Sequence, residues 1–108
     1  MITILAVGAD AFAIAEAAAP DPAVEVLVSR DAEEALEKLA RNRRIDAVLI
    51  TEAVDITGLA REIREEDPGA PPLYAPASSG SAPGVRVLAA GSPEELLGAL
   101  LRALSGET

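Results

Sequence analysis

The chain contains neither cysteine nor histidine. Without thiols there is no disulfide, no zinc–thiolate site and no cysteine nucleophile. Without imidazole, the commonest general base near neutral pH and the commonest metal ligand are both missing. Catalytic arrangements built on Ser-His-Asp or Cys-His are therefore excluded. We expect a protein that is not an enzyme and that holds no cofactor.

Aromatic residues and positive charge are also scarce. The 108 residues include one Phe, one Tyr and no Trp, and 9 Lys and Arg stand against 18 Asp and Glu, for a formal net charge of −9. The core must therefore be built from Leu, Ile, Val and Ala. The negative charge disfavours nucleic acids and anionic membranes as partners, because both are bound through Lys and Arg. Solubility is the plainer explanation of the charge itself.

No apolar run is long enough to span a bilayer. The segment Met1–Pro20 is apolar and ends in small residues, but it lacks a basic start and is interrupted by Asp10 and Glu16. It therefore does not have the pattern of a secretory signal peptide. We expect a single cytoplasmic domain over residues 1–108.

Residues 45–52 read Ile-Asp-Ala-Val-Leu-Ile-Thr-Glu and are the most informative segment. The short apolar run Ala47–Ile50 is typical of a central parallel strand that helices cover on both faces. In open α/β sheets, ligands and chemistry lie at the carboxyl ends of such strands. Here that end carries Thr51 and Glu52.

Strands and helices alternate along the chain. The tetrapeptide Ser92-Pro93-Glu94-Glu95 combines an N-cap serine, a proline at the first helical position and a glutamate at the third. Asp31 is placed to cap another helix. The alternation predicts a parallel sheet with right-handed crossovers. We expect strands at residues 2–7, 24–28, 47–50, 73–75 and 85–89, and helices at 11–19, from 31 to the arginines at 41–44, from 55 or 57 to 67, and from 92 to 105.

Charges within two strands suggest the order of the sheet. Glu25 and Arg86 interrupt the second and fifth strands, which suits edge positions. The order 2-1-3-4-5 of flavodoxin-like folds satisfies this arrangement. The crossover Pro76–Gly84 is short and rich in turn formers, whereas a parallel crossover usually contains a helix. We therefore expect one doubly wound five-stranded sheet whose fourth helix is missing or reduced to a turn.

This pattern resembles the receiver domains of bacterial two-component response regulators over essentially the whole chain. The resemblance rests on residues 4–7, 46–50 and 92–96, which look like the first and third receiver strands and the start of the last helix. It implies a phosphorylation site of two acidic Mg²⁺ ligands, an aspartate nucleophile, a hydroxyl residue and a lysine. In this chain those positions are occupied by Gly8 and Ala9, by Thr51, by Pro76 or Ala77 with Ser78 just beyond, and by Ala89.

None of the residues that the resemblance requires is present, so the chain looks like a degenerate pseudo-receiver. Asp10 and Glu52, together with Asp55, are weak candidates for a divalent cation site. Asp10 and Asp55 equally suit helix caps, and Glu52 suits a solvated loop. Thr51 is either an atypical phosphoacceptor or a passive β-branched strand residue.

These observations favour a non-catalytic signalling module that acts by protein–protein contact. A missing fourth helix would uncover the fourth and fifth strands beside the last helix, where a homodimer partner or another protein domain would dock. One alternative is a receiver still active in phosphorelay through an atypical acceptor. Another is the N-terminal pseudo-receiver of a larger regulatory protein. The predicted interface comprises Leu73, Tyr74, Val85, Val87, Leu97 and Leu101.

Overall fold

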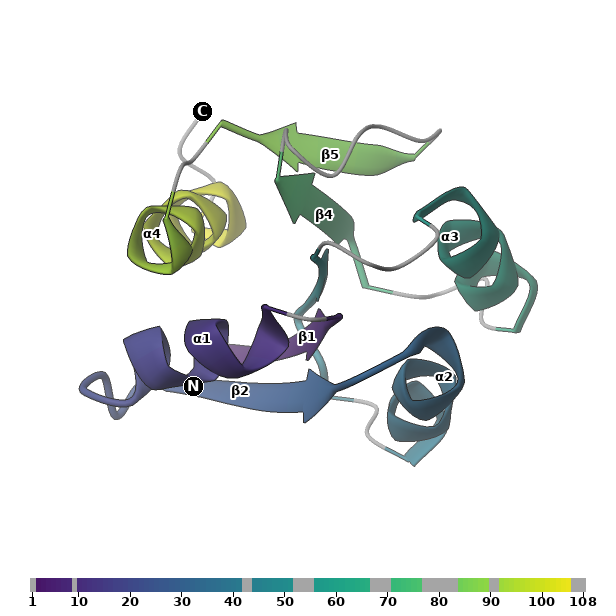
Figure 1. Ribbon diagram of the computed structural model, residues 1–108, viewed down its shortest axis with the longest axis horizontal. Coiled ribbons are helices and arrows are strands. Elements are labelled where there is room, and N and C mark those ends of the chain that lie inside the picture. Colours follow the sequence, from purple (N-terminus) through teal and green to yellow (C-terminus); the bar gives the residue numbers. More distant parts are fainter. Residues whose placement is uncertain are drawn as a thin grey trace.

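The computed structural model describes residues 2–8, 10–41, 44–51, 56–66, 71–76, 84–89 and 92–105 (Figure 1). Strands and helices alternate along the described residues as far as the fourth strand, as the sequence predicts, and no described helix separates the fourth strand from the fifth. The elements are β1 (Ile2–Val7), α1 (Ala11–Ala18), β2 (Val24–Ser29), α2 (Ala32–Arg41), β3 (Ala47–Ile50), α3 (Ile56–Glu66), β4 (Leu73–Pro76), β5 (Val85–Leu88) and α4 (Pro93–Leu104).

The five strands are parallel and lie in the order β2-β1-β3-β4-β5. This confirms the predicted flavodoxin-like order. It also confirms that Glu25 and Arg86, both exposed, belong to the two edge strands. A charged side chain in the middle of a strand is tolerated there because an edge strand is only partly covered.

Two apolar layers enclose the sheet. Figure 1 shows α2 and α3 on one side of the strands and α1 and α4 on the other. Successive side chains of a strand point to opposite faces, so Leu5 packs in the α2–α3 layer and Ile4 in the α1–α4 layer. The central strand β3 is buried along its whole length. Burial on both faces is the reason its sequence reads as an unbroken apolar run.

The helix ends agree only in part with the sequence predictions. Asp31 Oδ1 accepts from Glu34 N–H at 2.9 Å, and Ser92 Oγ accepts from Glu95 N–H at 3.2 Å, so both capping residues are confirmed. Asp10 occupies the N-cap position of α1, but its side chain makes no capping hydrogen bond. In α2, Ala35, Leu36 and Leu39 face the sheet, and Ala40 is exposed.

Residues 77–84 form the connection between β4 and β5. Only Gly84 of this connection is described, so the conformation of the rest of the predicted crossover lies outside the described residues. The described residues contain four helices, none of them between β4 and β5. Across all the described residues, no helix is long and apolar enough to cross a membrane.

Candidate functional site

The candidate site is the edge of the sheet where the strands end. Gly8, Ser29 and Thr51 lie there at or directly after the ends of β1, β2 and β3. The register of the ladders places Val7 beside both Ser29 and Ile50, so these three strand ends are neighbours. This is the edge at which doubly wound sheets bind ligands.

Thr51, at the position that would accept a phosphoryl group, is 1% exposed. Its Oγ1 donates to the Val7 carbonyl at 2.7 Å and accepts from the Asp10 N–H at 3.3 Å. Its own N–H donates to the same Val7 carbonyl at 2.7 Å. The single hydroxyl proton is therefore committed to the backbone, and the side chain ties the end of β3 to the end of β1 and to the start of α1.

Gly8, which the resemblance assigns to the first of the two acidic positions, has a backbone conformation that excludes most other residues. Its φ is 116°, in the region that L side chains rarely adopt. Its N–H donates to the Ser29 carbonyl at 2.9 Å, and its carbonyl accepts from the Ala11 N–H at 3.3 Å. An aspartate here would strain a backbone that is bonded on both sides.

Among the described residues, the other candidates do not complete a metal or phosphorylation site. Asp10 is exposed, and Ala89, at the lysine position, is also exposed. Ala9, Glu52, Asp55, Ala77 and Ser78 lie outside the described residues. Within the described part of the chain, no three acidic side chains are grouped closely enough to hold a metal ion.

Ser29 is the residue at this edge that sequence reasoning missed. It is fully buried, and its Oγ has no hydrogen-bond partner among the described residues. A buried hydroxyl without a partner is unfavourable in free energy. The sequence carries one weak signal for it, a lone serine closing the valine-rich run of β2.

The six residues of the predicted interface do not form one surface. Strand alternation divides them between the two faces of the sheet, and four of them are buried in the two core layers. The other two differ, since Val87 is 46% exposed and Leu101 is partly buried. Leu73 and Val85 belong to the α2–α3 layer, and Tyr74, Leu97 and Leu101 belong to the α1–α4 layer.

The comparison with known proteins rests on the fold. No protein-family model matches the sequence, and no curated protein matches it either. Solved structures do match. The chemotaxis response regulator CheY4 of Vibrio cholerae is 21% identical with a TM-score of 0.65, and the match covers 94% of this chain and 98% of that one.

Two further structures agree with this result. The receiver domain of the hybrid histidine kinase CckA is 25% identical with a TM-score of 0.67, covering 94% of this chain and 97% of the other. A response regulator receiver protein from Sinorhizobium medicae WSM419 is 23% identical with a TM-score of 0.66, covering 99% and 97%. The chain therefore has the receiver-domain fold of response regulators.

Proposed function

We propose that this protein is a receiver-like signalling module that has lost the ability to be phosphorylated and is not an enzyme. In this proposal it acts in the bacterial cytoplasm through contact with other proteins. The observation that carries the proposal is the state of Thr51. A phosphoacceptor must present a free nucleophilic oxygen to a phosphodonor. Thr51 Oγ1 is instead buried and bonded to the backbone of β1 and of residue 10.

The surroundings of Thr51 support the same conclusion. Phosphoryl transfer depends on Mg²⁺ and on cationic groups that neutralise the developing charge. The left-handed backbone at Gly8 disfavours an acidic ligand at that position, and Ala89 offers no ammonium group. What remains is a rigid α/β scaffold whose surfaces are available for recognition.

The test is incubation with acetyl phosphate and Mg²⁺, followed by intact-mass measurement. We expect no phosphoryl adduct under conditions in which a receiver with an aspartate acceptor is modified. Beryllofluoride with Mg²⁺ should likewise leave the NMR amide spectrum unchanged. A phosphoryl adduct that disappears in Thr51→Val would overturn the proposal in favour of an atypical acceptor. An adduct that persists in Thr51→Val would also overturn it and would place the acceptor elsewhere.

A further inference from the structure

The two edges of the sheet differ in how open they are to another strand. On β2, the Ile2 N–H donates to Ala23 O at 2.8 Å and the Gly8 N–H donates to Ser29 O at 2.9 Å. Backbone groups of a strand point alternately to its two sides. Val24, Val26 and Val28 therefore turn their N–H and C=O groups away from the sheet.

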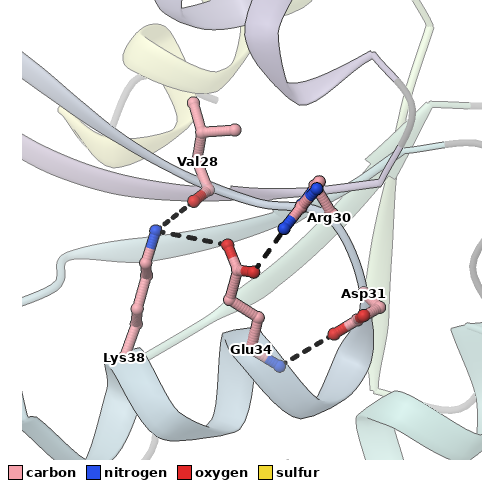
Figure 2. A network of polar contacts seen from close by, with 5 residues as sticks. All are labelled: Val28, Arg30, Asp31, Glu34 and Lys38. Atoms are coloured by element: carbon pink, nitrogen blue, oxygen red, sulfur yellow. Dashed lines mark hydrogen bonds and ion pairs between the residues drawn. The ribbon is translucent and has the colours of Figure 1, made fainter.

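At both ends of β2, an outward-facing backbone group already has a hydrogen-bond partner. The Val24 N–H donates to Asp21 O at 3.2 Å. At the other end, the Lys38 ammonium reaches from α2 and donates to the Val28 carbonyl, as Figure 2 shows. Glu34 holds this lysine from the same helix at 3.6 Å, and Arg30 approaches Glu34 at 3.9 Å. A lysine ammonium placed at the edge of a sheet hinders the addition of a further strand.

Among the described residues, none covers the outward row of β5 in this way. Val48 N–H donates to Pro72 O at 3.0 Å, so alternation turns Leu73 and Ala75 toward β5. Leu73 pairs with Val85 and Ala75 with Val87, and these two valines therefore direct their backbone groups away from the sheet. Among the described residues, none donates to or accepts from these outward groups. The Val87 side chain is 46% exposed at the same place.

We propose that the β5 edge pairs with β5 of a second copy of this chain, antiparallel and centred on Val87. This inference rests on the proposed function, since it names the partner that such a contact module takes. The two sheets would join edge to edge into one continuous sheet. The occupied β2 edges would then lie at its two ends and stop further growth.

The register of β5 is what selects a second copy as the partner. Outward-facing residues must pair with outward-facing residues, so a two-fold axis beside Val87 sets Val87 opposite itself and Val85 opposite Ala89. Arg86 then lies opposite Leu88 of the other copy, and no like charges face each other directly. An axis beside Arg86 would also pair the outward groups, by setting Val85 opposite Val87, but it would place two arginines directly opposite each other.

The first experiment is sedimentation equilibrium of the purified chain over about 1–500 µM, since an interface built on one strand edge is small. Salt of about 0.3 M screens the repulsion between two chains of charge −9. We expect a monomer–dimer equilibrium. Val87→Lys, which sets two ammonium groups opposite each other, should lower the association constant at least about tenfold.

Phe12→Lys is the matched control, because among the described residues Phe12 is the other large exposed apolar side chain, at 66% exposure on α1. It makes the same charge change and should leave the association constant unchanged. Circular dichroism confirms that both variants are folded. A monomer at every concentration would overturn the proposal, as would loss of the dimer in Phe12→Lys rather than in Val87→Lys.

The absence of native cysteine permits a direct test of the register. Opposed residues of a hydrogen-bonded antiparallel pair have Cα atoms about 5.5 Å apart, within the span of a disulfide. Val87→Cys should therefore form a covalent dimer under mild oxidation, whereas Phe12→Cys should not. Equal cross-linking of the two variants would contradict the register.

The outcomes distinguish this pairing from the proposed function. A phosphoryl adduct on a dimeric protein would contradict the proposed function alone, and a monomer without an adduct would contradict only the pairing.

Discussion

Two buried hydroxyl groups at the strand ends have opposite energetic roles. Thr51 Oγ1 both donates and accepts, and so joins β3 to β1 across 44 positions of sequence. Ser29 Oγ is equally buried but makes no hydrogen bond within the described part of the chain. A satisfied buried hydrogen bond contributes modestly to stability, whereas an unsatisfied buried group carries its full desolvation penalty. Side chains of similar chemistry therefore act in opposite directions at the ends of the two strands that flank β1.

We predict that Ser29→Ala raises the free energy of unfolding by about 1 kcal/mol, because it removes a buried hydroxyl that has no partner. Urea denaturation measures this change. Ser92→Ala is the matched control and should lower the free energy by about 1 kcal/mol, because Ser92 caps α4. Destabilisation by both substitutions would show that Ser29 Oγ has a partner such as a bound water.

At the scale of elements, two glycines show how place in the fold decides the effect of one residue type. Gly98 lies inside α4, and a Cβ built there meets nothing within 4 Å. Gly84 precedes β5 with φ at 77°, and a Cβ built there would lie 1.0 Å from Nη2 of Arg64 on α3. The Arg64 guanidinium therefore packs directly on the backbone before β5. Gly84 permits both the left-handed turn and this contact.

We predict that Gly98→Ala raises the free energy of unfolding by about 0.5–1 kcal/mol, since alanine restricts the unfolded chain and favours helix. Gly84→Ala should lower it by about 1–2 kcal/mol, because the left-handed φ is strained for alanine. Thermal unfolding of both variants beside the parent checks the pair. A stabilising Gly84→Ala would contradict the conformation assigned to the residue before β5.

At the scale of the whole molecule, charge opposes compaction. The net charge is −9 over 108 residues, and the described ion pairs, Arg30–Glu34, Lys38–Glu34 and Arg41–Glu37, all lie on or beside α2. Mutual repulsion of surface carboxylates is strongest at low ionic strength. The same repulsion acts between two copies and limits the strength of any dimer.

We predict that the Tm rises by roughly 2–5 °C when NaCl is increased from about 20 to about 200 mM, because screening relieves the repulsion. Differential scanning calorimetry at low protein concentration makes the measurement on the monomer. Glu62→Lys, at an exposed position on α3, lowers the net negative charge and should reduce the salt dependence. A Tm that falls with salt would mean that the ion pairs of α2 outweigh the general repulsion.

Most of the architecture followed from the sequence alone because it depends on local patterns. The apolar runs of β1 and β3 identified the central strands, and the charges at Glu25 and Arg86 identified the edges. Asp31 and Ser92 marked helix starts through capping chemistry that involves only the next few residues. The assignment of Gly8 and Ala89 to acidic and lysine positions rested instead on the resemblance to receiver domains, and it stays a prediction.

Only the tertiary structure decided which hydrogen bonds the side chains at neighbouring strand ends make and which side chains are exposed. Thr51 is committed to Val7 because β3 lies beside β1, and Ser29 Oγ is buried where no described residue bonds to it. The predicted interface divided between two faces because alternate residues of a strand point in opposite directions. Val87 is exposed on the strand at one edge of the sheet, and Lys38 bonds to the Val28 carbonyl of the strand at the other edge. Each of these facts joins residues distant in sequence, and a local pattern carries no information about such pairs.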